Sequence, residues 1–181
     1  MRTTREIQSE LLLIRCRTGD ATAFTDLTRL WERRLFYYIR RIVASEEDAW
    51  DALQEVWLRV WRRVGSIRDA SAFRSWLYAV AHNTAVSLVR HDARMEAAHD
   101  SIPEPAAGEA PTFENDAAER IHRGLDRVAP QQRQILTLFF LEEFSQAEIA
   151  VILGVPVGTV KSRLFHAKHA LRNVLDSEHE R

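Results

Sequence analysis

The sequence has a single cysteine, Cys16, and this excludes an intrachain disulfide. Because lone thiols are typical of reducing compartments, we expect a cytoplasmic protein. Only 6 glycines and 5 prolines occur in 181 residues, which excludes collagen-like and low-complexity chains. Apolar runs stay well short of the roughly 18–20 residues that a membrane span requires. The polar residues 1–10 also lack the apolar stretch of a signal peptide, so we expect no membrane insertion.

The chain also lacks an excess of charge of either sign, since 25 Lys and Arg stand against 26 Asp and Glu. Taken as one number, this neutrality argues against a nucleic-acid binder, which usually carries a basic excess. The charge is nevertheless unevenly distributed along the chain. The net charge is +4 over residues 1–95, −6 over residues 96–120 and +1 over residues 121–181. The neutrality is therefore a sum of two basic segments and one acidic segment.

The acidic middle of the chain has the composition of a linker. It contains three of the five prolines and shows no apolar periodicity. Such a segment cannot bury enough apolar surface to fold by itself. All five tryptophans and all three tyrosines precede it. The sequence therefore predicts two domains, over residues 1–95 and 115–181, joined by a flexible acidic linker over residues 96–114.

Both flanking segments are predicted to be helical. Helix-forming residues dominate and apolar residues recur at intervals of three and four, whereas the alternation typical of strands is nearly absent. The expected helices of the first domain run over about residues 4–19, 20–43, 45–64 and 72–90. Those of the second domain run over about residues 115–128, from residue 130, over 145–153 and over about 156–175. The predicted fold class is all-α, with two small helical domains.

The C-terminal segment carries the most specific pattern in the chain. Ser145-Gln-Ala-Glu148 has the spacing of a capping box, in which two side chains satisfy the first backbone amides of a helix. Gly154 would end that short helix, and Pro156 suits the first turn of the next one. A short helix, a tight turn with glycine and a longer helix form a helix-turn-helix motif.

The second helix of this motif has an apolar face and a polar face. A helical wheel places on the apolar face Val160, Leu164, Ala167, Leu171 and Val174. The opposite face and its flanks carry Thr159, Lys161, Ser162, Arg163, His166, Lys168, His169 and Arg172. No acidic residue occurs from Gly154 to Leu175. Small polar residues suit base edges and cations suit phosphates, so we expect a DNA-recognition helix. The alternative is the solvated face of a helix bundle, which normally mixes both signs of charge.

No pattern indicates catalysis or a metal site. His166 and His169 lie three residues apart, but no suitable third ligand occurs nearby. The chain has neither a Gly-rich phosphate loop nor a nucleophile motif. We therefore expect a protein that is not an enzyme and that needs no cofactor or metal ion.

The residues of the second domain resemble a known family. Pro130-Gln-Gln-Arg133, Ser145-Gln-Ala-Glu-Ile-Ala150 and Leu153-Gly-Val-Pro-Val-Gly-Thr-Val-Lys-Ser-Arg-Leu164 are similar to region 4 of extracytoplasmic-function (ECF, group IV) RNA polymerase sigma factors. The resemblance implies that this domain recognises the minus-35 promoter element. Its implied contacts are Thr159, Lys161, Ser162, Arg163, His166 and Lys168. Taken alone, the pattern also resembles the helix-turn-helix of response regulators.

The predicted helix over residues 45–64 supplies a second resemblance. Its buried face would hold Ala49, Leu53, Val56, Trp57, Val60 and Val64, and its outer face Asp51, Gln54, Glu55, Leu58 and Arg62. By chemistry alone the outer face fits an ordinary solvated surface, although an exposed Leu58 among charges favours a partner. The run Asp51-Ala-Leu-Gln-Glu-Val-Trp-Leu-Arg-Val-Trp61 resembles region 2.2, which docks on the clamp helices of the polymerase β′ subunit. The resemblance implies as polymerase contacts Asp51, Gln54, Glu55 and Leu58.

The predicted helix over residues 72–90 carries Trp76, Asn83 and Arg90 at intervals of seven residues, along one flank. An aromatic ring, an amide and a guanidinium in a row suit base stacking, base reading and phosphate binding. For Trp76 alone, packing at the edge of the core is the alternative. The run over residues 73–85 resembles regions 2.3 and 2.4, which melt and read the minus-10 element. The family receives a flipped base in the preceding loop, so the resemblance also implies contacts from Ser66, Arg68 and Asp69.

Together the resemblances cover roughly residues 15–90 and 116–173, without the middle region 3 of larger sigma factors. They imply a sigma factor whose partners are the β and β′ subunits of core RNA polymerase and promoter DNA, with an anti-sigma factor as a candidate further partner. The alternative is a helix-turn-helix regulator that is not a polymerase subunit. Its response-regulator form would need an α/β receiver domain, and no strands are predicted. Two departures stand out: Trp50 replaces what is often a small or acidic residue in the family, and His82 occupies a variable position.

The resemblance also gives the acidic linker a role. In the family this linker threads through polymerase channels that otherwise hold nucleic acid, and a net charge of −6 over residues 96–120 suits such a basic path. We further expect the linker to screen the DNA-facing residues of the free protein.

Overall fold

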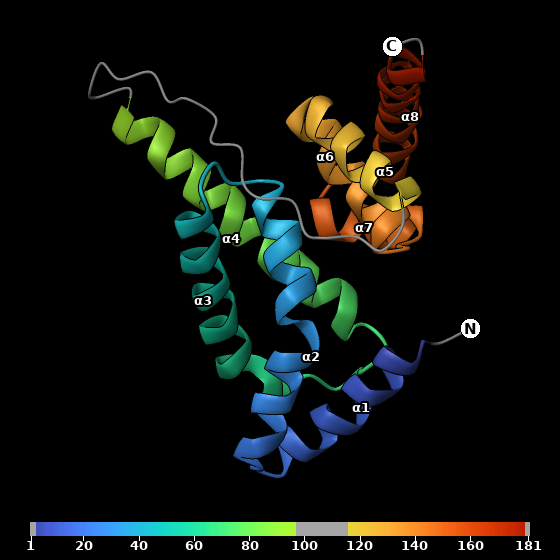
Figure 1. The fold of residues 1–181 in the computed structure, drawn as a ribbon. Coiled ribbons are helices and arrows are strands. Elements are labelled where there is room, and N and C mark those ends of the chain that lie inside the picture. Colours follow the sequence, from blue (N-terminus) through green and yellow to red (C-terminus); the bar gives the residue numbers. More distant parts are fainter. Residues whose placement is uncertain (1–2, 97–115, 180–181) are drawn as a thin grey trace. The chain divides into compact units, whose positions relative to one another are not determined.

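A computed structural model of the chain describes residues 3–96 and 116–179, and every regular element within these ranges is a helix (Figure 1). The chain divides into two compact units, Met1–Pro105 and Ala106–Arg181. The point of division lies within the predicted acidic linker. Residues 97–115, and with them the expectations for that linker, lie outside the described ranges.

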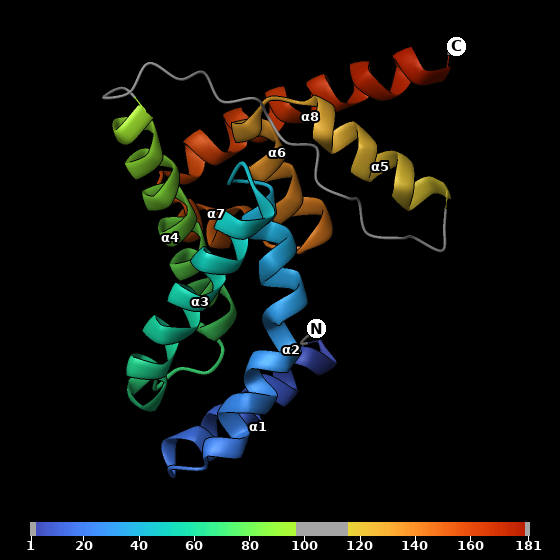
Figure 2. The same cartoon turned by 60° about the vertical axis from the view of Figure 1, so that its left-hand side comes forward.

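The N-terminal unit is a helical bundle. Its elements are α1 (Thr4–Arg17), α2 (Ala21–Arg40), α3 (Glu46–Arg63), the 3-10 turn η1 (Val64–Ser66) and α4 (Phe73–Glu96). Helix α2 contacts α1, α3 and α4, and α3 also packs along α4, as Figures 1 and 2 both show. The largest fully buried side chains of this unit are Leu13, Leu27, Trp31, Leu35, Tyr38, Ile39, Leu53, Phe73, Leu77 and Tyr78.

Side-chain caps explain where the helices of this unit begin. The Asp20 carboxylate accepts hydrogen bonds from the first backbone amides of α2. Ser45 and Asp48 form a capping box at the start of α3, at the spacing predicted from the sequence. Gly19, between α1 and α2, has a φ of +85°, a backbone conformation that favours glycine. The chain reversal between the two helices is therefore encoded locally.

The C-terminal unit is built around its last helix. Its elements are α5 (Asp116–Arg127), α6 (Pro130–Leu136), the π-helical turn η2 (Thr137–Leu141), α7 (Gln146–Leu153) and α8 (Val157–His179). Helix α8 packs against α5, α6 and α7. A Cβ atom on Gly124 of α5 would lie only 3.0 Å from Leu171 Cδ1, so glycine allows α5 to approach α8 closely. Arg133 donates hydrogen bonds to the carbonyls of Leu125, Asp126 and Val128, which lie at and just beyond the end of α5.

The structure extends the sequence predictions at three places. Helix α4 continues to Glu96 instead of ending near Arg90, and α8 continues to His179 instead of ending near Leu175. Both predicted ends lacked a glycine or proline stop, so the helices run on. The π-helical turn was not predicted. Its backbone hydrogen bond, from Glu142 N to Thr137 O at 3.0 Å, spans five residues, and the spacing of apolar residues does not indicate it.

No single helix in the described residues is long and apolar enough to span a membrane, although the bent pair α7 and α8 meets the length and composition criteria jointly.

Candidate nucleic-acid and polymerase interfaces

Helices α7 and α8 form the predicted helix-turn-helix. Ser145 N donates to Glu148 Oε2 at 2.8 Å, and Glu148 N donates to Ser145 Oγ at 3.3 Å, which closes the capping box at the start of α7. Gly154 ends α7 with a φ of +63°, in the left-handed conformation. The helix axis then turns by 104° into α8. This crossing is typical of DNA-binding helix-turn-helix motifs.

Helix α8 buries its predicted apolar face and exposes its predicted polar face. The buried residues of α8 are Val160, Leu164, Ala167 and Leu171. Lys161, Ser162, Arg163 and His166 are exposed, whereas Thr159 is half-buried. The exposed face therefore combines small polar groups near the N-terminus of the helix with cations that no acid on the same stretch neutralises. This is the chemistry that base edges and phosphates require.

Two residues of α8 differ from the sequence-based picture. The Lys168 Nζ lies 4.2 Å above the Phe139 ring and 5.3 Å from the Phe140 ring, a cation–π arrangement that holds it against its own domain. Phe165, which the sequence analysis did not single out, is 67% exposed and its ring packs edge-on against that of His166. The sequence could have indicated Phe165, because the helical wheel places this apolar residue outside the apolar face of α8.

The pair of histidines considered as metal ligands, His166 and His169, lies on the surface of α8. His166 and His169 are both exposed. Within residues 3–96 and 116–179, no group of three or more His, Cys, Asp or Glu is placed to hold a metal ion.

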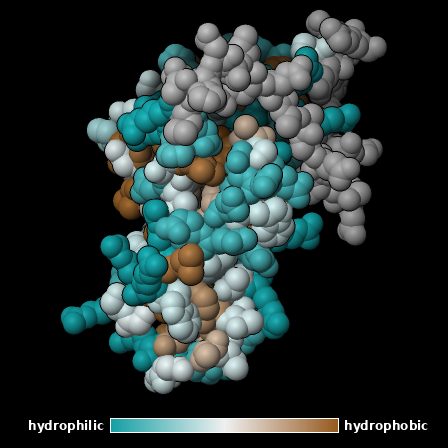
Figure 3. All heavy atoms as spheres, turned by 90° about the vertical axis from the view of Figure 1, so that its left-hand side faces the viewer, coloured by the Kyte–Doolittle hydropathy of each residue, from teal (hydrophilic) through white to brown (hydrophobic). Residues whose placement is uncertain are grey.

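Helix α3 presents the predicted outer face. Asp51 and Gln54 are exposed, and Leu58 is 52% exposed. Glu55 is half-buried and accepts a hydrogen bond from Arg59 Nε at 2.8 Å, so its carboxylate is already engaged within the helix. Figure 3, which faces the side of α3 and α4, shows hydrophobic patches set among hydrophilic side chains. An apolar residue ringed by charges is typical of a protein-binding surface.

Two tryptophans extend this face beyond the predicted residues. Trp50 is 42% exposed and its ring centroid lies 4.2 Å from that of Phe36 on α2. Trp61 is 54% exposed and lies edge-on to Phe24 of α2, at 4.7 Å. The sequence could have indicated both tryptophans, because their spacing from Gln54 and Leu58 places all four residues on the same side of α3.

Helix α4 and the loop before it position the predicted minus-10 residues. Asn83 and Arg90 are exposed, whereas Trp76 is half-buried and its ring lies 6.0 Å from Phe73, which is packing at the edge of the core. In the loop, Asp69 Oδ1 accepts hydrogen bonds from Ser71 N at 2.9 Å and Ser71 Oγ at 2.6 Å.

The other two loop candidates differ in how they are held. Ser66 Oγ donates to the Arg63 carbonyl at 2.8 Å, whereas the Arg68 side chain is exposed. Both Ser66 and Asp69 therefore also shape the loop itself.

His82, which the sequence analysis named without a role, makes a contact between two helices. Its Nδ1 lies 3.0 Å from the Tyr38 hydroxyl, which ties α4 to α2 directly beside Asn83. Burial, with a smaller effect of the Arg90 charge, lowers the pKa of His82 to about 4. The ring is therefore neutral at neutral pH and adds no charge to this part of the surface.

Fold and surfaces together define an all-helical, two-domain protein with a helix-turn-helix in its second domain. Family models agree with this class: Sigma-70 region 2 matches residues 27–95, and Sigma-70 region 4 matches residues 118–171. The ECF RNA polymerase sigma-E factor of Escherichia coli is 30% identical over 187 residues, with 94% of this chain and 95% of that protein covered. The RNA polymerase sigma-H factor of Pseudomonas aeruginosa is 28% identical, with 93% and 94% covered.

Two solved structures share the fold. The sigma factor RpoE of Bartonella quintana, in complex with the anti-sigma factor NepR, has a TM-score of 0.74 at 22% identity, with 84% of this chain and 96% of that chain covered. CnrH, in complex with the cytosolic domain of CnrY, has a TM-score of 0.65 at 24% identity, with 94% and 98% covered.

The chain belongs to the extracytoplasmic-function family of RNA polymerase sigma factors. It is therefore a transcription initiation factor that binds core RNA polymerase and promoter DNA, and it is not an enzyme.

Proposed function

We propose that α8 reads the minus-35 element through its acid-free face. Thr159, Ser162 and His166 would approach base edges, and Lys161, Arg163 and Lys168 would bind phosphates or guanine. The observation that carries this assignment is that five of the six proposed contacts on α8, all except Thr159, are exposed, with no acid from residue 154 to 175. Because Lys168 lies over Phe139, it contributes less than Arg163.

We propose that the outer face of α3 binds the polymerase β′ subunit through Asp51, Gln54, Glu55 and Leu58. Leu58 supplies an apolar contact and the carboxylates select a basic partner surface. Glu55 contributes less than Asp51, since it would have to exchange its hydrogen bond with Arg59. The β subunit is the further polymerase partner in this proposal.

We propose that α4 and its preceding loop open and read the minus-10 element. Ser66, Arg68 and Asp69 would receive a flipped base, while Asn83 reads the strand and Arg90 binds phosphate. Trp76 would offer only its exposed edge for stacking, because part of its ring packs on the core. Flipping a base costs a few kcal/mol, which contacts in the loop offset.

The remaining assignments follow from the family. We propose domain limits of residues 1–95 and 115–181, an acidic linker over residues 96–114 that follows basic polymerase channels, and a cytoplasmic location. The complexes of RpoE with NepR and of CnrH with CnrY support an anti-sigma factor as a further partner. Neutralising the linker acids should raise the affinity of the free protein for minus-35 DNA at low salt, and an unchanged affinity would contradict the screening role.

A run-off transcription assay with purified core polymerase and a promoter library tests the whole proposal. We expect specific transcripts that depend on this protein. The alternative, a regulator that acts without being a polymerase subunit, predicts no transcripts and a footprint by the protein alone. The family match to region 2 favours the sigma factor over this alternative.

Paired variants test the division of roles. Asp51→Ala with Glu55→Ala should weaken binding to core polymerase and leave minus-35 binding intact. Arg163→Ala should do the reverse. Equal loss of both activities in either variant would indicate misfolding and would remove support for separate surfaces.

A further inference from the structure

Helix α1 carries an apolar surface that none of the proposed contacts uses. Ile7, Leu11 and Ile14 recur at intervals of four and three residues, so they lie on one face of the helix. They are 49%, 59% and 54% exposed, whereas α1 fully buries only Ser9 and Leu13 among its described side chains. A helix normally turns its apolar stripe toward the core. A stripe of this size turned outward marks an interaction face.

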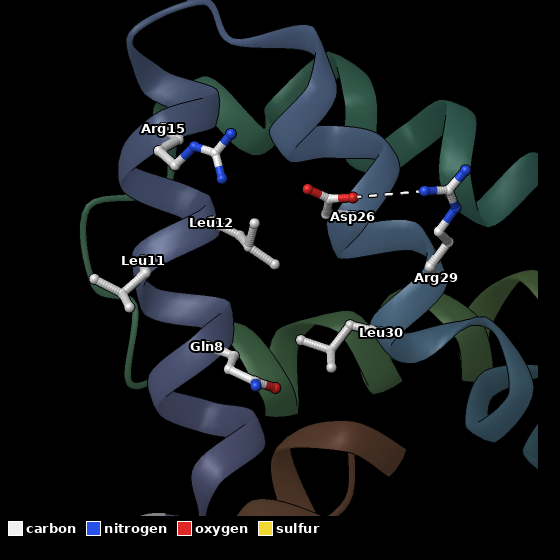
Figure 4. Close-up of a pocket in the computed structure, with 7 residues that line it drawn as sticks. All are labelled: Gln8, Leu11, Leu12, Arg15, Asp26, Arg29 and Leu30. Atoms are coloured by element: carbon white, nitrogen blue, oxygen red, sulfur yellow. Dashed lines mark ion pairs between the residues drawn. The ribbon is translucent and has the colours of Figure 1, made fainter.

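A groove lies beside this stripe, between α1 and α2 (Figure 4). It has a volume of about 500 Å³ and is lined by Gln8, Leu11, Leu12, Arg15, Asp26, Arg29 and Leu30. Leu12 of α1 and Leu30 of α2 point into the space between the two helices, while Leu11 turns outward at the edge. The groove therefore has an apolar floor that continues into the exposed stripe of α1. This shape suits a third helix laid along the pair.

The rim of the groove has an excess of exposed positive charge. Arg29 is 75% exposed, and Asp26, its carboxylate partner at 3.7 Å, is 46% exposed. Arg15 is 50% exposed and pairs with the more buried Asp20 at 2.8 Å. Arg33, one turn beyond Arg29, is a further exposed cation of α2. A ligand that carries carboxylates beside its apolar face would meet arginines on this rim.

We propose that the groove between α1 and α2 binds an amphipathic helix of a partner protein, with Asp and Glu flanking the apolar face of that helix. Three aliphatic anchors and a groove with an apolar floor are the elements of helix-in-groove recognition. Affinity for nucleic acid comes chiefly from cations that contact phosphates, so a row of three aliphatic side chains favours a protein partner over nucleic acid. Helix α1 carries three arginines against two glutamates, so the α1 of a second copy would add a net positive charge to the same cationic rim. The site lies outside the polymerase and promoter contacts proposed for α3, α4 and α8.

Two synthetic helical peptides of about 18 residues test the proposal, with the same leucine face but flanked by Glu in one and by Lys in the other. Fluorescence anisotropy with the full chain should show that the Glu peptide binds at least about tenfold more tightly than the Lys peptide. Leu11→Gln with Ile14→Gln should weaken Glu-peptide binding about tenfold or more. Arg29→Glu with Arg33→Glu should reverse the preference. Val151→Gln, which alters a 66% exposed residue of the other unit, is the matched control.

Several outcomes would overturn the proposal: no binding of the Glu peptide, equal binding of both peptides, or an unchanged preference after the arginine reversal. Displacement of the peptide by single-stranded DNA would assign the face to nucleic acid instead. A dimer in sedimentation that Leu11→Gln dissociates would assign it to a second copy. Without peptide, run-off transcription by the Leu11→Gln, Ile14→Gln variant should match that of the unaltered protein. This measurement tests promoter-directed transcription independently of peptide binding in the groove.

Discussion

The outer faces of α3 and α8 are both polar, but they differ in the sign of their charges. On α3, Asp51 and the ion pair of Glu55 with Arg59 mix both signs around an exposed Leu58. On α8, cations occur without a single acid over residues 154–175. Mixed charge around an apolar centre suits a protein partner, whereas charge of one sign suits a polyanion. This difference in charge is the basis for the proposed division of roles, in which α3 binds polymerase and α8 binds DNA.

The largest expected effect tests whether the two units are stable independently. Leu164 is 2% exposed in the core of the C-terminal unit, so Leu164→Ala should destabilise that unit by about 2–5 kcal/mol. Because all five tryptophans lie in the N-terminal unit, tryptophan fluorescence should show an unchanged urea transition there while circular dichroism shows an earlier one. Leu58→Ala, at a 52% exposed site, is the control and should stay within about 0.5 kcal/mol. A shift of both transitions would show that the units fold as one.

The next effect sharpens the contrast of charge on α8. Arg163→Ala should weaken holoenzyme binding to minus-35 DNA by about 1–3 kcal/mol, because an exposed guanidinium is lost from the recognition face. Lys168→Ala should change it by less than about threefold, since that ammonium lies over Phe139. Salt-dependent anisotropy measures both. Equal losses would mean that Lys168 leaves the Phe139 ring on binding.

A third prediction concerns pH and only the N-terminal unit. Since the folded pKa of His82 is about 4 against an ordinary value of 6.5, the unfolded chain takes up a proton first as the pH falls. The neutral His82 ring therefore contributes fully to the stability of the folded unit above about pH 6.5, and this contribution is lost toward pH 4. The free energy of unfolding should fall by about 1–2 kcal/mol between pH 7 and pH 5. His82→Gln, which keeps a partner for Tyr38 but cannot titrate, should flatten this slope in tryptophan-monitored urea unfolding. An equally steep slope in the variant would assign the pH dependence to other groups.

The smallest expected effect compares the two capping boxes. Ser45→Ala should destabilise the N-terminal unit and Ser145→Ala the C-terminal unit, each by about 1 kcal/mol, through loss of the hydrogen bond to the third helical amide. Tryptophan fluorescence should detect the first substitution and not the second. Detection of both would again argue against independent units.

Much of the fold could be predicted from the sequence, because its information is local. The boxes at Ser45 and Ser145, Gly154 and the apolar wheel of α8 each act within a few residues. The same is true of the exposed face of α3, whose spacing alone places Asp51, Gln54 and Leu58 outward. Family resemblance then gave these faces their expected partners.

Other features depend on residues that meet only in the folded chain. Lys168 over Phe139, Trp50 on Phe36 and His82 against Tyr38 each join separate helices, so helical periodicity could not show them. The groove between α1 and α2 likewise exists only because two helices pack side by side with Leu12 and Leu30 facing the gap. The sequence by itself determined the helices, their faces and the helix-turn-helix, since these follow from short-range spacing. The tertiary structure alone decided which side chains are engaged and which stay free to bind, because burial and hydrogen bonding depend on neighbours far along the chain.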